Sequence, residues 1–429
     1  MSKRATPSVG ARGRIRSPRG QGATFSAVQE LEARRLMATF SVTSFGAVPN
    51  DGGDDRAAIL ATINASGPGD TIFFPAGTYN TSQEIFVKGN NRFYKGDQAG
   101  VSKIIGTGTH IFHVNENFIT FKYLSFQGEG VFVDRTNATQ TGDVIGVVID
   151  NNHFVVVGGS DKNGVEFTAG LRDSFITNNW FDQISGDNGI YGFHWNNLII
   201  ANNSFMNGNE GMHVVDNSDT SQSLLIEQNY FSGLHRMGIE YQGGAWNTVV
   251  QDNYYENPVL YSNVSQNLDT FAYSIVADRS HFTITRRNTA IGTDRPDGTG
   301  VRVMFELGGT NLECYQNYSV GGFNVIAVNG SHATGTAHDN RISNYLNGPY
   351  NANSATVQFA NNGPNTAITT WDMNRGKPGP NHRITNVPLP DPPSDPDPDP
   401  DPDPPPPPPP PPDPGAPATP IGLTGRTVG

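Results

Sequence analysis

Short runs of alternating apolar and polar residues recur through the middle of the chain, and each reaches an asparagine that an aromatic residue usually follows. Two neighbouring copies are SFITNNWF, from Ser174 to Phe181, and NLIIANNSF, from Asn197 to Phe205. Alternation over so few residues is typical of a β-strand. Successive copies lie 23 to 35 residues apart, counted between the aligned asparagines Asn152, Asn179, Asn203, Asn229, Asn253, Asn288, Asn317 and Asn340. A repeat of this length indicates a solenoid.

A second short strand follows in each repeat and is usually opened by glycine. Examples are GVEF at Gly164, GIYGF at Gly189, GMHVV at Gly211 and GIEYQ at Gly238. Because no helical pattern separates the strands, we predict a coil in which each turn lays its strands in parallel on the turn before, about 4.8 Å apart. Stacked asparagines can then hydrogen-bond along the axis, and asparagine tolerates the left-handed backbone of a corner. The aligned asparagines are therefore predicted to be structural.

The segment before the repeats has a different pattern. We predict a helix from near Asp54 to about Ala65, followed by a strand from Thr71 to Phe74. Asp54 or Asp55 can cap the helix. One side of this helix is apolar and would face the core: Ala58, Ile59 and Ile63.

The stretch from Phe45 to Tyr79, with its FGA, its acidic turn and GDTIFFPAGTY, resembles the first turn of the pectate lyase-like superfamily. The asparagine-bearing repeats extend the resemblance to about residue 345. It implies an all-β, right-handed parallel β-helix with an N-terminal capping helix, in an exported bacterial protein that handles a polysaccharide. The NTD, paired Asp, GHG and RIK elements of the polygalacturonase branch are absent, and so is the RxPxxR element of calcium-dependent pectate lyases. No catalytic residue is therefore carried over from the family.

Composition changes at both ends of the chain. Residues 1–38 read as a disordered basic leader, and VQELEARRLMAT within it resembles the LEPRxLL-type export segment, with Ala33 where that pattern has proline. Residues 39–387 are predicted to form the β-helix, and residues 388–415 an extended Asp/Pro-rich linker. Residues 416–429 resemble the start of a truncated fibronectin type III module. We expect an extracellular or cell-surface location, and a further C-terminal domain or a cell-surface assembly as partners.

Charge and cysteine content narrow the function classes. The net charge of −12 argues against nucleic-acid binding, which requires a basic face. Cys314 is the one cysteine, so no intrachain disulfide forms, and it falls inside a strand pattern where burial is expected. No apolar run is long enough to span a membrane. His110, His113, His281, His332 and His338 show no metal-ligand spacing, so no metal or other cofactor is predicted, and calcium is an alternative without a supporting motif.

The outward positions of the glycine-opened strands gather ionisable side chains. If the apolar residue after each glycine points inward, the next one faces solvent. This outward column reads Glu166, Tyr191, His213, Glu240, then Tyr273 or Ser274, then Arg302. Loops that lead into the same strands add Asp187, Glu210, His235 and Arg236.

Two chemistries are compatible with different members of this set. Glycoside hydrolysis requires two carboxyls roughly 5–9.5 Å apart. Glu166 and Glu240 lie three turns apart, about 14 Å, and fail this test, whereas Glu210 offers Glu240 a closer partner. Eliminative cleavage of a uronate instead requires a base, an acid and a group that binds the carboxylate.

Tyr191 and His213 would serve elimination as acid and base, with Arg236 or Arg302 on the carboxylate. We therefore predict two sets, catalytic residues Tyr191, His213, Glu240 and Arg236, and substrate-binding residues Glu166, Glu210, His235 and Arg302. Two alternatives to a uronate lyase stay open. One is a glycoside hydrolase, and the other is a non-catalytic carbohydrate-binding or adhesion module whose charged column only pairs charges.

Overall fold

The computed structural model describes residues 37–108, 110–135, 142–157, 162–184, 186–216, 220–243, 246–256, 273–292, 303–321, 324–328, 333–343, 348–352, 357–360 and 362. All strands described below belong to one compact unit, Ala38–Gly429. The predicted linker and tail, and all but the last two residues of the predicted leader, lie outside the described residues.

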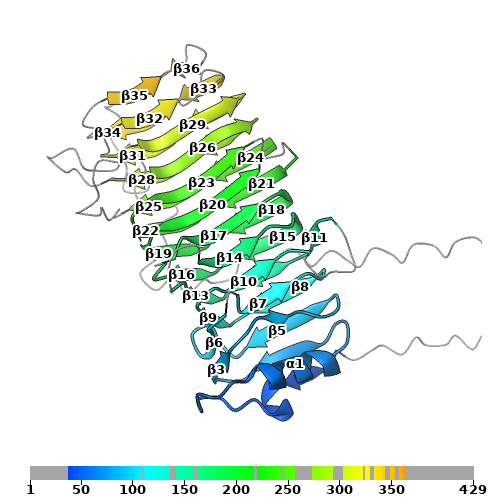
Figure 1. Cartoon of the computed structure of the whole chain (residues 1–429). Helices are drawn as coiled ribbons and strands as arrows, with labels where there is room; N and C mark the ends of the chain where they lie inside the picture. The colour runs from blue at the N-terminus through cyan, green and yellow to red at the C-terminus, as the bar shows by residue number, and fades with distance from the viewer. Residues whose placement is uncertain are drawn as a thin grey trace, which may run out of the picture. The chain divides into compact units, whose positions relative to one another are not determined.

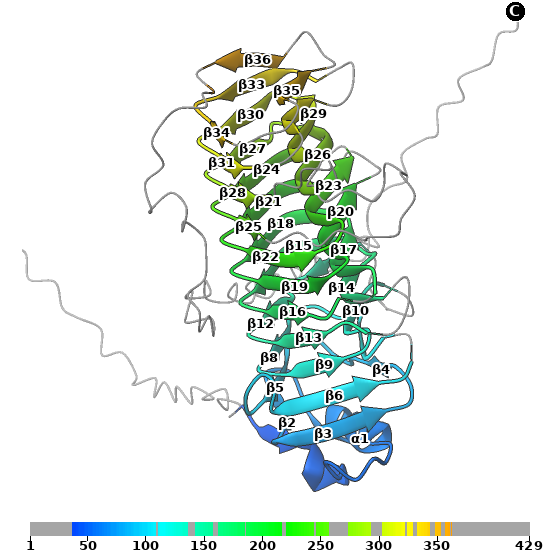
Figure 2. The same ribbon diagram turned by 90° about the vertical axis from the view of Figure 1, so that its left-hand side faces the viewer.

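The unit is a parallel β-helix built from three stacks of short strands, and every pairing between turns is parallel. Figure 1 shows the first stack and Figure 2 the third, with the strands following one another along the axis in sequence order. The first stack consists of β4 (Ile85–Phe86), β7 (Phe112–Val114), β10 (Val131–Val133), β14 (Asn163–Phe167), β17 (Asn188–Phe193), β20 (Glu210–Asp216), β23 (Met237–Gly243), β26 (Tyr273–His281), β29 (Val303–Thr310), β32 (Asn324–Val328) and β35 (Gly348–Ala352).

The other two stacks complete each turn. The second stack consists of β1 (Thr39–Ser41), β2 (Thr71–Phe74), β5 (Arg92–Gly96), β8 (Ile119–Lys122), β11 (Val144–Ile145), β12 (Val148–Asp150), β15 (Leu171–Thr177), β18 (Trp195–Ala201), β21 (Gln222–Glu227), β24 (Trp246–Gln251), β27 (Ile284–Arg286), β30 (Leu312–Tyr315), β33 (Gly335–His338) and β36 (Val357–Ala360). The third stack consists of β3 (Gly77–Thr81), β6 (Ser102–Gly106), β9 (Ser125–Gln127), β13 (His153–Val155), β16 (Trp180–Asp182), β19 (Ser204–Gly208), β22 (Tyr230–Leu234), β25 (Tyr254–Glu256), β28 (Thr289–Ile291), β31 (Tyr318–Val320) and β34 (Arg341–Ser343). The predicted all-β fold class is confirmed.

The aligned asparagines form a buried ladder at the corner between the second and third stacks. Asn179 Nδ2 donates to Asn203 Oδ1 (3.0 Å), and Asn203 Nδ2 donates to Asn229 Oδ1 (3.0 Å). The same side-chain bond continues from Asn340 to Asn362, one rung beyond the predicted set. The left-handed backbone lies one residue earlier than each ladder asparagine, as at Asn178 (φ 57°). The ladder side chains are thus free to bond along the axis while their neighbours turn the corner.

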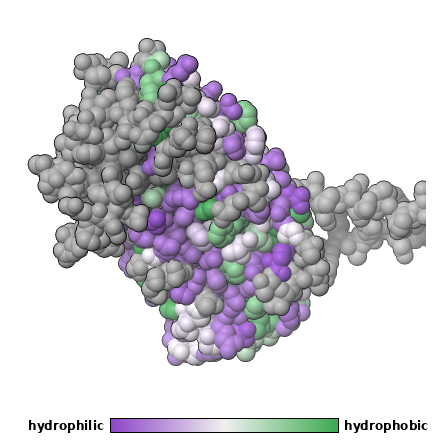
Figure 3. Space-filling view, turned by 45° about the horizontal axis from the view of Figure 1, so that its top comes forward, coloured by the Kyte–Doolittle hydropathy of each residue, from purple (hydrophilic) through white to green (hydrophobic). Residues whose placement is uncertain are grey.

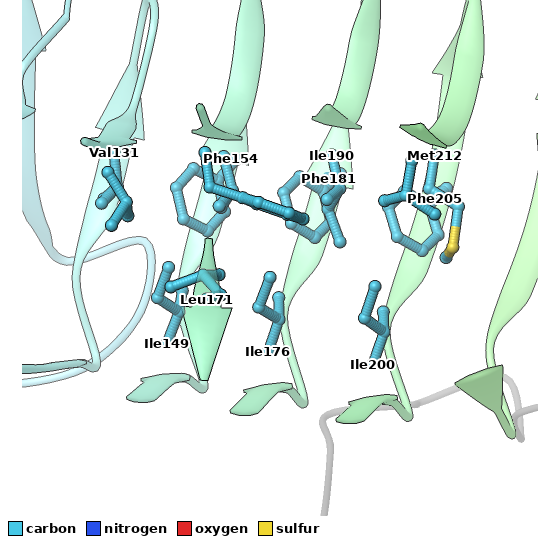
Figure 4. Packing of buried hydrophobic residues seen from close by; sticks show 14 of the residues in the cluster. Val131, Ile149, Phe154, Leu171, Ile176, Phe181, Ile190, Ile200, Phe205 and Met212 are labelled. Atoms are coloured by element: carbon cyan, nitrogen blue, oxygen red, sulfur yellow. The ribbon is translucent and has the colours of Figure 1, made fainter. Parts of the chain in front are cut away.

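Stacked phenylalanines explain the glycines that open the first-stack strands. Phe154, Phe181 and Phe205 lie face to face in the core, with ring centroids 4.7 and 4.8 Å apart (Figure 4). A Cβ on Gly189 would lie 2.6 Å from the Phe205 ring and 2.7 Å from the carbonyl oxygen of Gly211. Atoms of the next turn leave no room for a methyl group at position 189, so this position requires glycine.

A short N-terminal region covers the first turn. After the 3₁₀-helix η1 (Val42–Phe45), α1 runs from Arg56 to Ala65, two residues later than the predicted start. Asp54 Oδ1 accepts the N–H of Arg56 (3.1 Å). The Asp55 carboxylate instead accepts the N–H groups of Val48 and Asn80, and so ties this region to β3. Ile59 and Ile63 are buried as predicted.

The described surface is mainly polar. Hydrophilic residues dominate the described part of the face in Figure 3, with small separate hydrophobic patches. Cys314 is buried, as predicted. Among the described residues no helix is long and apolar enough to cross a membrane.

Candidate active site on the first strand stack

Strand pairing in the first stack aligns four of the predicted site residues. Glu166 pairs with Tyr191, Tyr191 with His213, and His213 with Glu240. This order confirms the predicted column over four consecutive turns. Each member follows a glycine by two positions, so the packing that demands glycine also fixes the register of the column.

Beyond Glu240 the predicted register is wrong. Val276 and then Glu306 occupy the column in place of Tyr273 or Ser274 and of Arg302. The reason is that β26 begins at Tyr273 without an opening glycine and pairs this residue with the start of β23. Arg302 lies outside the described residues, so its assignment to substrate binding stays a prediction.

Glu210 is the first residue of β20, although we predicted it on a loop. It pairs with Asn188, which pairs in turn with Asn163, so a second polar column runs three residues before the first. Within this column Asn188 Nδ2 donates to Asn163 Oδ1 (3.1 Å). The second column therefore brings Glu210 beside His213.

Glu210, His213, Arg236 and Glu240, here called the His213 group, come together on β20 and β23. Glu210 Oε2 lies 3.9 Å from His213 Nδ1, and Glu240 Oε2 lies 3.8 Å from His213 Nε2. Glu210 Oε1 lies 2.9 Å from Arg236 Nη1. Gln242 Nε2 donates to the other oxygen of Glu240. The imidazole is thus flanked by a carboxyl group at each of its nitrogens.

The members of the His213 group differ sharply in exposure. The side chains of Glu210 and Glu240 are 0% and 3% exposed, whereas those of His213 and Arg236 are 19% and 34% exposed. Glu240 was predicted to face solvent, and its burial is a correction to the simple alternation of a strand. A ligand on the surface therefore meets His213 and Arg236, with the two carboxyl groups beneath them.

Burial also sets the protonation states of this group. It raises the pKa of Glu210 to about 8, and the nearby charge of Glu240 adds to this while Arg236 opposes it. Burial lowers the pKa of His213 to about 4, with a further contribution from the positive charge of Arg236. Near neutral pH the imidazole is neutral and the Glu210 carboxyl holds a proton.

Tyr191 lies next to this group on β17. Its ring centroid is 5.5 Å from that of His213, at an interplanar angle of 69°. The Phe193 ring also packs against the tyrosine, with centroids 5.1 Å apart. A phenol and a neutral imidazole thus share one side of the site.

Two further predicted residues lie at the edge of the site. Asp187 precedes β17, and its side chain accepts from Asn209 Nδ2 (3.1 Å). His235 and Arg236 precede β23. The backbone N–H of His235 donates to Gly208 O (2.8 Å), and its assignment to substrate binding stays a prediction.

Sequence reasoning missed a second cluster, which begins one strand away from Tyr191. His110 Nε2 lies 2.9 Å from Glu129 Oε1 and 3.5 Å from Glu166 Oε2, and we call these three residues the His110 group. Glu84 lies 3.3 Å from His110 Nδ1 and 3.4 Å from His113 Nδ1. The polar position three residues before the outward column, shared by Glu129 and Glu210, is the sequence signal that points to it.

Among the described residues, two sets of three side chains have atoms that could bind a metal ion within 4.8 Å of one another. The first set is His110, Glu129 and Glu166, and the second is Glu210, His213 and Glu240. Each set has one cation beside it, Lys162 on Glu129 in the first and Arg236 on Glu210 in the second. The first set is the better candidate for a metal ion, because Glu210 in the second set is fully buried and holds a proton near neutral pH.

Comparison with known proteins agrees with this architecture. The fold and its ionisable face define a parallel β-helix protein of the pectate lyase-like class. Residues 39–259 match the family described as rhamnogalacturonase A/epimerase, pectate lyase-like, and the chain belongs to this family. It is thus a member of a polysaccharide-active β-helix family. No curated protein sequence matches the chain.

Several solved structures are similar to this chain at low sequence identity. The surface adhesin PfbA of Streptococcus pneumoniae is 15% identical over 73% of this chain and 91% of its own, with a TM-score of 0.50. The alginate lyase of Paenibacillus sp. strain FPU-7 is 12% identical over 76% of this chain and 99% of its own (TM-score 0.45). A mannuronan C-5 epimerase A-module of Azotobacter vinelandii is 16% identical over 76% of this chain and all of its own (TM-score 0.45). At 15% identity the likeness to the adhesin, with its TM-score of 0.50, establishes the fold alone.

Proposed function

We propose that the protein cleaves a uronate-containing polysaccharide by elimination, at or outside the surface of a bacterial cell. The observation that carries the proposal is the pairing of Tyr191 with His213, whose ring centroids lie 5.5 Å apart. Elimination requires a base for the proton and an acid for the leaving oxygen, and these two side chains lie next to each other. Arg236 lies within the same group and supplies a cation.

The step assigns one role to each of the partly exposed side chains Tyr191, His213 and Arg236. The neutral imidazole of His213 takes the proton from the carbon next to the uronate carboxylate. The electron pair of that C–H bond forms a double bond to the neighbouring carbon, and the glycosidic C–O bond breaks. The leaving oxygen takes the phenolic proton of Tyr191. Proton transfers of this kind each accelerate a reaction roughly 10²–10⁴-fold.

Arg236 is suited to hold the carboxylate of the substrate. Its side chain is one-third exposed, and its partner Glu210 is protonated near neutral pH because burial raises the pKa of that carboxyl to about 8. The protonated Glu210 carboxyl therefore does not neutralise the guanidinium charge, which can pair with the carboxylate of the substrate. Charge that develops on the carboxylate as the proton leaves strengthens this contact.

Burial argues against hydrolysis by the closest carboxyl pair. An acid and a nucleophile or base must both reach the glycosidic bond. Glu210 and Glu240 are 0% and 3% exposed, so neither carboxyl reaches a polymer on the surface. We assign them to positioning instead, with Glu210 beneath Arg236 and both carboxyls beside the imidazole.

The test is incubation of the full chain with a panel of uronate polymers, followed by absorbance of the unsaturated product. We expect the absorbance to rise with at least one polymer, and His213→Ala and Tyr191→Phe to abolish the rise. His153→Ala is the matched control. His153 lies in the third stack, away from the site, and its ring stacks on that of Trp180 with centroids 4.7 Å apart. New reducing ends without unsaturation would mean hydrolysis. Exchange of the uronate hydrogen without chain shortening would mean epimerisation, and binding without turnover would mean an adhesion module.

A further inference from the structure

A cluster of imidazole and carboxyl groups lies beside the proposed active site on β7, β10 and β14 and the segments that lead into them. We propose that His110, Glu129 and Glu166 bind one divalent transition-metal ion of the zinc type. This inference goes beyond the proposed reaction and does not depend on it. Glu166 pairs with Tyr191, so an ion held there would lie about one strand spacing from the tyrosine.

The spacing of the ligand atoms fits such an ion. In a tetrahedral zinc site with bonds near 2.1 Å, neighbouring ligand atoms are about 3.4 Å apart. His110 Nε2 lies 2.9 Å from Glu129 Oε1 and 3.5 Å from Glu166 Oε2. Only small side-chain shifts would bring the three atoms to coordination distance, and a fourth position would stay open to water or substrate.

Outer contacts hold each of these side chains in the required orientation. The other ring nitrogen of His110 lies 3.3 Å from Glu84 Oε1, and Lys162 Nζ binds the other oxygen of Glu129 (2.6 Å). Asn163 Nδ2 donates to Glu166 Oε2 (2.9 Å). A metal-binding histidine usually donates its second N–H to a carboxylate in this way.

Aromatic packing fixes the plane of the His110 ring. Phe132 stacks on it with centroids 4.2 Å apart and an interplanar angle of 12°. His110 Nε2 faces Glu129 Oε1 and Glu166 Oε2 and contacts both carboxyl groups. The stacked ring thus holds this nitrogen between the two carboxyl oxygens that would share the ion with it.

A second buried imidazole points into the same cluster. His113 is 5% exposed, and its Nε2 contacts Asp134 while its Nδ1 lies 3.4 Å from Glu84. That Nδ1 has no hydrogen-bond partner among the described atoms. Asp134 and His113 thus support Glu84, and Glu84 in turn supports His110.

The charges of the cluster favour a cation. The ion pairs described here join four carboxyl groups, those of Glu84, Glu129, Asp134 and Glu166, to two imidazoles and the ammonium group of Lys162. Even with both imidazoles protonated, the negative groups outnumber the positive ones by four to three. Buried carboxylates in excess are costly, and an ion among them relieves the cost.

The donor set selects the metal. One nitrogen and two carboxylate oxygens suit zinc, cobalt or manganese, whereas calcium takes six to eight oxygens. We therefore expect the full chain to bind Zn²⁺ more tightly than Ca²⁺.

Titration calorimetry on the chelator-treated full chain tests the site with Zn²⁺ alone. We expect one equivalent to bind, and Glu166→Gln and His110→Ala to abolish this binding. Glu84→Gln should weaken it roughly 10–100-fold, because it removes the carboxylate that orients His110. Glu240→Gln is the matched control, since it changes a carboxylate of the other cluster and should leave Zn²⁺ binding unchanged.

Folding is checked by circular dichroism of each variant. If His110→Ala does not fold, Glu166→Gln decides, because it preserves the size of the side chain. The visible spectrum of bound Co²⁺ should also be lost in Glu166→Gln. Absence of Zn²⁺ binding to the wild-type chain overturns the proposal, and so does binding that survives Glu166→Gln or that disappears in Glu240→Gln.

Discussion

Tyr191 and His213 occupy paired positions on β17 and β20, with ring centroids 5.5 Å apart. The two residues are neighbours because one turn of the β-helix lies on the next. Core packing fixes this register, since Gly189 and Gly211 have no room for a side chain beside the stacked phenylalanines. The proposed acid and base are therefore held on packed, paired strands rather than on loops.

The first prediction concerns the pH dependence of turnover. His213 must be neutral to accept a proton, and burial together with the charge of Arg236 lowers its pKa to about 4. Activity should therefore fall as the pH drops through about 4 and be insensitive to His213 ionisation above it. An acid limb near the ordinary histidine pKa of about 6.5 would contradict the assignment.

A variant of Arg236 sharpens this test. Because Arg236 contributes to the lowered pKa of His213, Arg236→Met should move the acid limb of kcat to higher pH. The same variant should raise KM for a uronate polymer, since the carboxylate loses its cation. A raised KM with an unmoved acid limb would assign Arg236 to binding alone.

The second prediction concerns Glu210 and stability. Its pKa rises from about 4.5 to about 8 on folding, so the native state holds this proton more tightly than the unfolded chain. The Glu210 contribution to the free energy of unfolding is therefore full below about pH 4.5, and it is lost as pH rises toward 8. Urea unfolding at several pH values should show this loss in the wild type, and a smaller one in Glu210→Gln. Equal slopes in both proteins would contradict the buried, protonated carboxyl.

The third prediction concerns the asparagine ladder. Asn203 donates to Ile176 O and Asn229 Oδ1, and its own Oδ1 accepts the backbone N–H of Asn179. Asn203→Ala leaves these buried groups unsatisfied and should cost about 3 kcal/mol of unfolding free energy or more. Asn196→Ala is the matched control, because that side chain is exposed and its backbone is not left-handed. Similar urea midpoints for the two variants would mean that the ladder contributes little.

The fourth prediction concerns the glycines that open the first-stack strands. In Gly189→Ala the new methyl group would lie 2.6 Å from the Phe205 ring and 2.7 Å from a carbonyl oxygen. The resulting strain should destabilise the fold by about 1–3 kcal/mol and displace Tyr191 two residues later. Gly108→Ala, where the methyl group would have ordinary contacts of 3.5 Å or more, should change the thermal midpoint much less. A neutral Gly189→Ala would show that the core can shift to accept it.

The sequence predicts the site best where the repeat is most regular. Between Glu166 and Glu240 every turn has its ladder asparagine and its opening glycine, so the sequence predicts which residues of successive turns pair. Past Glu240 the spacing of ladder asparagines grows to 35 residues between Asn253 and Asn288, and the register prediction was wrong there.

The His110 group escaped prediction for a related reason. His110 and Glu129 precede Asn152, the first aligned asparagine, so no repeat marks which of their turns correspond. The alternation of inward and outward residues along a strand also could not predict the burial of Glu240, because that burial depends on which side chains pack over the strand. Burial decides its role here, since an inaccessible carboxylate can orient an imidazole but cannot reach a glycosidic bond.

The central claim is that His213 removes a proton from the carbon next to a uronate carboxylate. The most direct test is the rate of unsaturated-product formation on a uronate polymer that carries deuterium at that carbon. The account predicts that deuterium slows the wild-type reaction and that His213→Ala lowers the rate by a factor of about 100 or more. A rate insensitive to deuterium would contradict it, and so would a His213→Ala protein that cleaves as fast as the wild type.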